Sequence, residues 1–210
     1  MKLSNKASFR SRLRKAWRAA SRTRREEGSS LYEFAMVLPL LSMLLVGIIY
    51  GGITFYDYVI LAEGVAQGAS TLAMSRGAAT PCTAAQTAAQ KNAYNLNQTY
   101  LSACTTAGCS PGVWQPTFTG PGGSSCSVTT AGTTNPNTGA NCTTTAPCQI
   151  LVSGDYGTIG ATYPCNLSIP FTTFNLCPVK QTTGTGTNGA TCSASAPCYF
   201  ISSQTTVRIE

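Results

Sequence analysis

The 210-residue chain contains no histidine, and charged residues make up only 10% of it. Without histidine, the chain can form neither a His-ligated metal site nor a Ser-His-Asp or Cys-His nucleophile. Glu63 and Asp155 are the only carboxylates between residues 58 and 209, so a pair of carboxylates for acid–base catalysis is not expected there. The sequence therefore predicts no enzyme, no cofactor and no metal site.

Basic residues are scarce beyond the first 25 positions. Ten of the 14 Lys and Arg residues lie between Lys2 and Arg25, and past residue 60 the net charge is only 4 − 3 = +1. This basic tail precedes a long uncharged run, and basic residues ahead of a membrane span mark the cytoplasmic side of that span. Membrane topology therefore explains the positive charge, and nucleic acid is not expected as a partner.

Cysteine is missing from the first 81 positions, whereas all ten cysteines lie between Cys82 and Cys198. An even number of cysteines confined to one part of the chain is typical of disulfides in an oxidising compartment. The spacing C-x5-C differs from the usual zinc knuckle, and C-x-x-C is absent. Disulfides are therefore expected in place of metal ligands.

The longest run without a charge covers residues 34–56, which are 23 positions. A helix of that length measures about 35 Å, enough to cross a hydrocarbon core of about 30 Å. A buried core helix and a cleaved signal peptide, whose apolar core is usually shorter, are the alternatives. With the basic tail cytoplasmic, we expect a single-pass membrane protein whose residues 57–210 lie on the other side of the membrane.

Three residues inside this run are unusual. Pro39 removes one backbone hydrogen bond of the helix and predicts a kink there. Gly47 and Gly51 form a G-x3-G pair, a spacing that lets a second helix approach closely. Glycine is also common in membrane helices without such a contact, so both interpretations stay open.

The stretch "EEGSSLYEFAMVLPLL" resembles the N-terminal signature of TadE-like proteins, minor pilin-like components of tight adherence (Flp-type) pilus systems. Gly28, Ser29, Glu33 and Phe34 also fit the wider type IV prepilin pattern of a basic leader, a glycine, four residues and a glutamate. The resemblance covers about residues 22–76 and implies cleavage between Gly28 and Ser29 by a prepilin peptidase. It also implies that Glu33 pairs with the N-terminal amine of a neighbouring subunit; the alternative for Glu33 is an interfacial residue that reaches the headgroups.

Four segments follow from these patterns: a basic cytoplasmic leader, 1–28; a transmembrane and extended helix, 29–77; a second helix, 78–104; and a Cys-rich, Thr/Gly-rich strand-and-loop domain, 105–210. The first helix should end near Gly77, and the second should begin after Thr80 as N-cap and run over residues 82–102. The predicted fold class is α+β and pilin-like. Its long N-terminal helix continues into a small disulfide-rich domain with short antiparallel strands.

The Cys-rich domain contains an internal repeat, "GANCTTTAPCQILVS" (139–153) and "GATCSASAPCYFISS" (189–203). Each copy predicts a local disulfide followed by a strand, Cys142–Cys148 in one and Cys192–Cys198 in the other. Cys104–Cys109 is a further candidate pair, and Cys82 should tie the second helix to the later region. Short apolar runs near 149–152, 171–176, 199–202 and 207–209 are the strand candidates.

These observations favour a structural or assembly subunit, a minor pilin-like protein of a tight adherence type IV pilus or a related secretion apparatus. Its expected partners are the membrane, other pilin-like or pilus assembly subunits and a prepilin peptidase. The resemblance implies a place in the bacterial inner membrane with the C-terminal domain in the periplasm, or at the cell surface with a pilus. The alternative is a single-pass anchored, disulfide-rich adhesin or binding module without a filament role.

Overall fold

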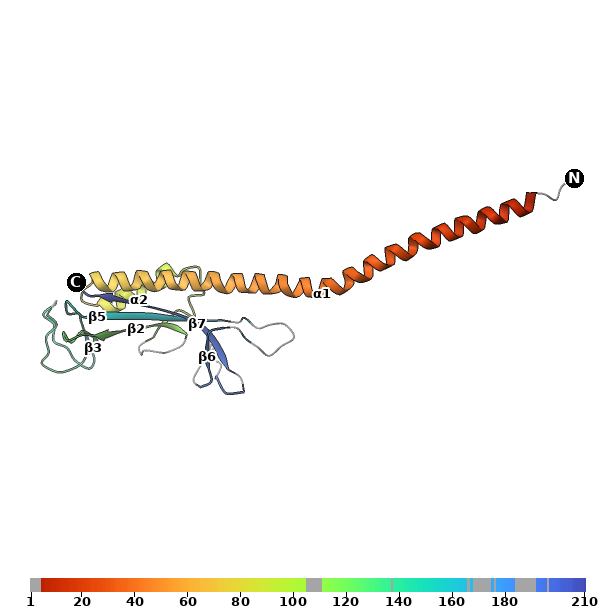
Figure 1. Cartoon of the computed structure of the whole chain (residues 1–210). Coiled ribbons are helices and arrows are strands. Elements are labelled where there is room, and N and C mark those ends of the chain that lie inside the picture. The colour runs from red at the N-terminus through yellow and green to blue at the C-terminus, as the bar shows by residue number, and fades with distance from the viewer. Residues whose placement is uncertain are drawn as a thin grey trace. The chain divides into compact units, whose positions relative to one another are not determined.

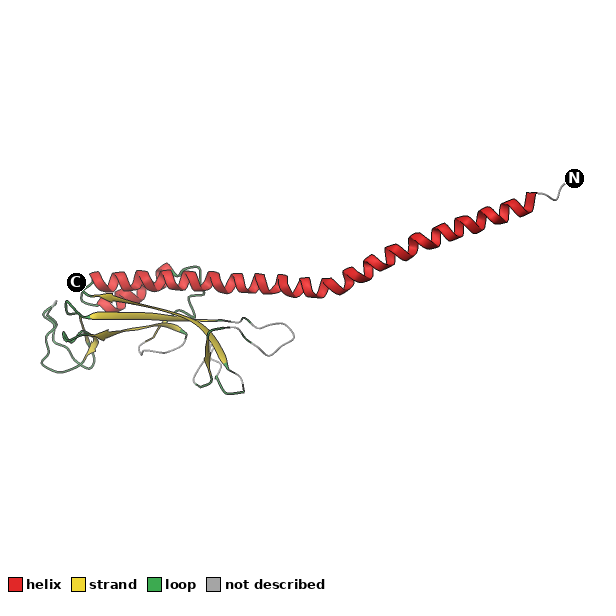
Figure 2. Cartoon of the chain, in the orientation of Figure 1, coloured by secondary structure: helices red, strands yellow, loops and turns green. Residues whose placement is uncertain are grey.

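The computed structural model of the chain describes residues 5–104, 111–136, 138–165, 167, 175, 177–183, 192–195 and 197–210, with side chains from residue 30 onward. The chain divides into two compact units, Met1–Ile49 and Tyr50–Glu210. One long helix contributes to both units, and the second unit adds a shorter helix and two β-sheets (Figure 1, Figure 2). The fold is α+β and disulfide-rich, as the sequence predicts.

Helix α1 spans Asn5–Met74 and therefore includes most of the basic leader as well as the apolar run. It ends at Met74, three residues before the predicted stop at Gly77. A tight turn closes this end, in which the Ser75 amide donates to the Leu72 carbonyl at 3.2 Å and the Ala78 amide donates to the Ser75 carbonyl at 2.9 Å.

Helix α2 spans Pro81–Asn92, so the prediction of a helix over residues 82–102 is wrong in its second half. Beyond Ala93 the chain forms single turns, because polar side chains bond to the backbone instead of leaving it to a helix. Asn97 Oδ1 accepts from the Thr99 amide at 3.0 Å, and Gln98 Nε2 donates to the Ala93 carbonyl at 2.8 Å. Asparagine also has a low helix propensity, and residues 92, 95 and 97 are all asparagine.

The larger sheet has five strands in the order β1-β2-β5-β7-β6. All its pairs are antiparallel except the parallel β1–β2 pair. A separate two-stranded sheet pairs β3 with β4. The strands are β1 Ala103–Cys104, β2 Gly112–Thr119, β3 Ser125–Val128, β4 Cys148–Ile150, β5 Tyr156–Pro164, β6 Val179–Gln181 and β7 Cys198–Arg208.

The hydrophobic core lies between the helices and one face of the larger sheet. In α1 the buried side chains recur every three or four residues from Ile60, so that one stripe of the helix faces the sheet. Residues from α1, α2, the turns after α2, three strands and the positions that follow β4 and β7 make up this cluster: Ile60, Leu61, Val65, Ala69, Leu72, Ala85, Ala89, Ala93, Leu96, Leu101, Val113, Leu151, Ile159, Ala161, Ile201 and Ile209.

The two helices approach each other through small residues. A Cβ on Gly68 would lie 2.9 Å from both the Ala85 carbonyl oxygen and the Ala89 Cβ, and a Cβ on Gly64 would lie 2.8 Å from the Ala89 carbonyl oxygen. Such distances are too short for any side chain larger than hydrogen. The Ala93 Cβ lies 3.1 Å from the same Gly64 position, so α2 runs antiparallel to this part of α1.

Candidate functional site

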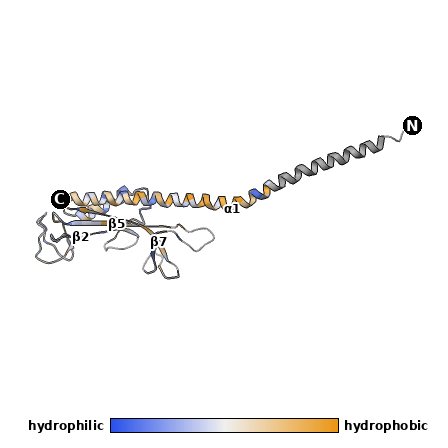
Figure 3. Ribbon diagram, viewed as in Figure 1, coloured by the Kyte–Doolittle hydropathy of each residue, from blue (hydrophilic) through white to orange (hydrophobic). Residues whose placement is uncertain are grey.

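From Leu31 to Val59, α1 exposes large apolar side chains on every side of the helix. A helix that is apolar all round belongs in a protein core or in a membrane, and these side chains are not covered by the described part of the chain. The segment Ser30–Met74 is long and apolar enough to cross a membrane (Figure 3). The exposed residues are Leu31, Tyr32, Phe34, Met36, Val37, Leu38, Leu40, Leu41, Met43, Leu44, Leu45, Ile48, Ile49, Tyr50, Ile53, Phe55, Tyr56, Tyr58 and Val59.

Glu33 lies near the start of this apolar stretch and is exposed. Among the described side chains, none forms a hydrogen bond or ion pair with it. Gly28 and Ser29 lie in the helical backbone of α1, and their surroundings are outside the described side chains. The carboxylate of Glu33 is therefore open to a group from outside the described part of this chain.

Pro39 stands inside α1, six residues after Glu33. Because proline has no amide hydrogen, the carbonyl of Ala35 has no partner in the usual helical pattern. The Ser42 hydroxyl donates to the Pro39 carbonyl at 2.9 Å, and the Thr54 hydroxyl donates to the Tyr50 carbonyl at 3.0 Å. These two hydroxyls are thus satisfied within the helix itself.

Gly47 and Gly51 have free space around them, unlike Gly64 and Gly68. A Cβ on either residue would meet no atom within 4 Å among the described neighbours. This G-x3-G pair therefore makes no helix contact within the described part of the chain. The second pair, Gly64 and Gly68, was missed, although the spacing of Ala85, Ala89 and Ala93 could have indicated it.

Two of the described disulfides close the copies of the repeat. Cys142 and Cys148 form one with their Cα atoms 5.1 Å apart, and Cys192 and Cys198 form the other at 5.4 Å. In each copy two hydroxyls between the cysteines lie 3.1 Å apart, Thr143 with Thr145 and Ser193 with Ser195. The two copies thus share a local structure, although their strands, β4 and β7, belong to different sheets.

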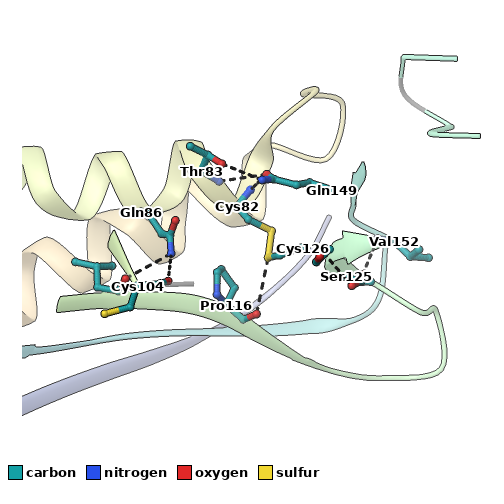
Figure 4. The surroundings of a disulfide bond; sticks show 12 residues. Cys82, Thr83, Gln86, Cys104, Pro116, Ser125, Cys126, Gln149 and Val152 are labelled. Carbon is teal, nitrogen blue, oxygen red and sulfur yellow. Dashed lines mark hydrogen bonds between the residues drawn. A yellow bond between two sulfur atoms is a disulfide. The ribbon is translucent and has the colours of Figure 1, made fainter. Parts of the chain in front are cut away.

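The other described disulfides are Cys82–Cys126 and Cys165–Cys177. The first joins the start of α2 to β3, which agrees with the expected link between the second helix and the later region (Figure 4). Cys104 is also disulfide-bonded. Its predicted partner, Cys109, lies outside the described residues.

The start of α2 is capped by a side chain distant in sequence. Thr80 makes no side-chain capping bond. Instead, Gln149 Oε1 accepts from the amides of Cys82 at 2.8 Å and Thr83 at 3.2 Å, while its amide nitrogen donates to the Thr83 hydroxyl at 2.8 Å (Figure 4). Helix α2 is thus fixed to the smaller sheet by a disulfide and a cap side by side.

Asp155 is a buried carboxylate, 1% exposed, at the start of β5. Its Oδ1 accepts from the Gly122 amide at 2.8 Å, and its Oδ2 accepts from the Ser124 amide at 2.9 Å. The amide and hydroxyl of Ser124, followed by the Gly122 amide, lower the pKa of Asp155, against the opposing effect of burial. Asp155 therefore holds the turn before β3 as an anion. In the described part of the chain, no three His, Cys, Asp or Glu residues gather as they would around a metal ion.

Polar and aromatic groups meet where the exposed part of α1 ends. Asn95 Nδ2 donates to the Tyr56 hydroxyl at 3.3 Å, and the Asn97 amide donates to the Tyr163 hydroxyl at 3.2 Å. Tyr163 and Tyr100 form an edge-to-face pair with their ring centres 6.0 Å apart.

The ionisation of Tyr163 reflects these surroundings. Burial raises its pKa above the usual value, and the neighbouring Asp57 and Tyr100 raise it further, against the opposing effect of the Asn97 amide. The last residues of β5 thus lie beside the turns that follow α2 and near Asp57 of α1.

Comparison with known proteins finds a family likeness in α1, over the apolar stretch and the part that follows it. Residues 28–70 match the family model described as TadE-like protein. No curated protein and no solved structure matches the chain. The matched interval begins at Gly28, includes Glu33, Pro39, Gly47 and Gly51, and ends in the part of α1 that packs on the sheet.

Proposed function

We propose that this protein is a minor pilin-like structural subunit of a tight adherence type IV pilus or a related secretion apparatus. The observation that supports this function most is the match of residues 28–70 to the TadE-like family. The interval covers a helix whose apolar surface is exposed on all sides and which then packs on a folded unit. That combination suits a subunit that is stored in a membrane and associates with others through the helix.

In this proposal a prepilin-type peptidase cleaves between Gly28 and Ser29, and the new amine of Ser29 pairs with Glu33 of a neighbouring subunit. A carboxylate within an apolar environment is costly unless an opposite charge compensates it. Glu33 is exposed and has no partner among the described side chains, so it is free for such a pair. In this proposal the N-terminus is cytoplasmic and the disulfide-bonded unit is periplasmic, an orientation that the basic leader supports.

The helix surface offers two further assembly features. Gly47 and Gly51 leave room for a second helix to approach, since no described atom occupies that space. Pro39 leaves the Ala35 carbonyl without its helical partner, and a neighbouring helix can donate to it. Both features are proposed as contacts between subunits.

A charge-neutral substitution tests this function in the native host. Glu33→Gln should abolish incorporation into pilus assemblies, whereas Glu63→Gln, at an exposed acid on the same helix beyond the apolar stretch, should leave it intact. Incorporation is measured by co-purification with pilus components after membrane extraction. Normal co-purification of the Glu33→Gln protein would contradict the proposal.

The alternative, an anchored adhesin or binding module, predicts a different result. An adhesin needs the membrane helix only as an anchor, so Glu33→Gln would retain full adhesion of the cells to their surface. Loss of adhesion together with loss of pilus components favours the assembly subunit.

A further inference from the structure

The end of the exposed apolar stretch belongs to the same compact unit as the sheets. This unit begins at Tyr50, and Tyr50, Ile53, Phe55, Tyr56 and Tyr58 are all exposed within it. Three of these five side chains are tyrosines, the residue that concentrates with tryptophan at membrane–water interfaces. The tyrosines therefore indicate that the membrane surface crosses α1 within this unit, near Tyr56.

The turns that follow α2 lie at this level. Asn95 is hydrogen-bonded to Tyr56, so the segment around residues 93–100 reaches the place where α1 changes from exposed to packed. Tyr94 next to it is 73% exposed, the largest exposure of any tyrosine described. Lys91 lies in the last turn of α2, three residues before Tyr94, and is also exposed.

The opposite end of the unit lies well away from this level. Gly157 near the start of β5 contacts Leu72, since a Cβ there would lie 2.7 Å from Leu72 Cδ2. Leu72 is sixteen residues beyond Tyr56 in α1 and therefore about 24 Å farther along the helix axis. Tyr163, near the other end of β5, is within the electrostatic reach of Asp57. Strand β5 thus runs along α1, from a far end at Tyr156 to a near end at Tyr163.

We propose that the 93–100 segment is a lipid-contacting surface, with Tyr94 inserted among the headgroups beside Tyr56, and that Lys91, at the adjoining end of α2, is directed toward anionic lipid. The assignment rests on the membrane anchor of the proposed function and deepens it, because it gives the periplasmic unit a fixed face toward the bilayer. An exposed tyrosine has an apolar ring and a polar hydroxyl, which matches the headgroup region. Lysine adds electrostatic attraction to anionic lipid.

A lipid-facing surface has a consequence for assembly. While the subunit is in the membrane, the unit is held by two contacts, the helix and the 93–100 segment, and both must leave the bilayer together when the subunit is extracted. The surface is then released for new contacts only in the assembled state.

Spin-label depth measurements on the full chain test this surface. A keto amino acid is introduced at position 94, 156 or 45, and a hydroxylamine nitroxide is attached, which leaves the ten cysteines untouched. Each protein is reconstituted in vesicles of phosphatidylethanolamine and phosphatidylglycerol. Accessibility to oxygen, which enters the bilayer, is compared with accessibility to a water-soluble nickel chelate. Tyr156 is the matched control, because it is a tyrosine exposed to 48% at the far end of β5.

The expected result is a ratio of oxygen to nickel accessibility several-fold higher at position 94 than at position 156, and higher still at position 45. Equal ratios at 94 and 156, with position 45 deep in the bilayer, would overturn the lipid contact and leave the anchor standing. A water-exposed label at position 45 would overturn the membrane anchor and the lipid contact with it. Spin–spin broadening at position 94 that disappears on dilution with unlabelled protein would assign the surface to a second copy, and would also overturn the proposal.

Discussion

The side-chain oxygen of Gln149 lies 2.8 Å from the amide nitrogen of Cys82, and it caps a helix that begins 68 residues earlier, at Pro81. The helix has no capping bond from its own N-cap residue, Thr80. The repeat thus contributes to the fold beyond its own disulfide, since the residue that follows Cys148 fixes α2.

Removing this cap should weaken the unit Tyr50–Glu210 without unfolding it. Gln149→Ala should lower the free energy of unfolding by about 1 kcal/mol, the usual loss for a helix cap. Gln204→Ala, at an exposed position of β7, serves as the control. Denaturant unfolding followed by circular dichroism measures both, and equal stability of the two variants would contradict the capping role.

The two glycine pairs of α1 should respond in opposite ways to alanine. Gly68→Ala should lower the free energy of unfolding by about 1–3 kcal/mol, because the new methyl group collides with Ala85 and Ala89. Gly47→Ala should leave the stability of the unit Tyr50–Glu210 unchanged, since no described atom lies within 4 Å of the new methyl group. Thermal unfolding of both variants in detergent, compared with the wild type, measures the two effects. A stable Gly68→Ala protein would mean that the helices can separate at little cost.

The hydrogen bonds to Asp155 predict a dependence of stability on pH. Because its folded-state pKa is lowered, the contribution of Asp155 is complete above the pKa of the unfolded chain, about 3.9, and is lost as pH falls through the folded value. Asp155→Asn should therefore lower the unfolding temperature at pH 7, and the difference from the wild type should shrink in acid. Glu210→Gln, an exposed acid near the C-terminus, controls for charge. A difference that stays constant down to pH 2 would refute the role of the carboxylate as an anion.

The disulfides should differ in their contribution according to the loop that each closes. The bond Cys82–Cys126 joins residues 44 positions apart, and Cys142–Cys148 joins residues 6 apart. Loop entropy predicts a loss of about 4 kcal/mol for the double alanine variant of the first pair and about 2 kcal/mol for the second. Unfolding in urea measures both losses, and the reverse order would show that local strain or packing outweighs loop length.

The helical part of the fold could be predicted from sequence because its signals are strong and local. An uncharged run of 23 residues and an apolar stripe from Leu61 indicated α1. The two C-x5-C disulfides could be predicted because a loop between cysteines six residues apart has little conformational freedom. The end of α2 could not, since its alanines suggest a longer helix and the turns after Asn92 depend on side chains such as Gln98.

Strands β2 and β5 were not among the strand candidates, and for β5 the reason is physical. Strand β5, "YGTIGATYP", is rich in small residues and resembles a loop. Its glycines are needed because Leu72 packs against Gly157 and the Trp114 ring covers Gly160, contacts from segments far away in the chain. Of the four apolar runs, 149–152 and 199–202 fall at β4 and β7. Run 207–209 lies at the end of β7, and most of 171–176 is outside the described residues.

The candidate site could be predicted only as far as its own sequence motif extends. Glu33 and Pro39 were selected from one short stretch, and the family match over residues 28–70 includes both. The proximity of Asn95 to Tyr56 is a tertiary contact between residues 39 positions apart, and no local pattern indicates it.

The intact mass and N-terminal sequence of the membrane-extracted, unreduced protein are the most direct test of the pilin-like function. If a prepilin peptidase processes the protein, the mature chain begins at Ser29, with all ten cysteines in disulfides. A chain that still carries Met1 and the basic leader would contradict it, because Glu33 would then have no freed amine of a neighbour to pair with.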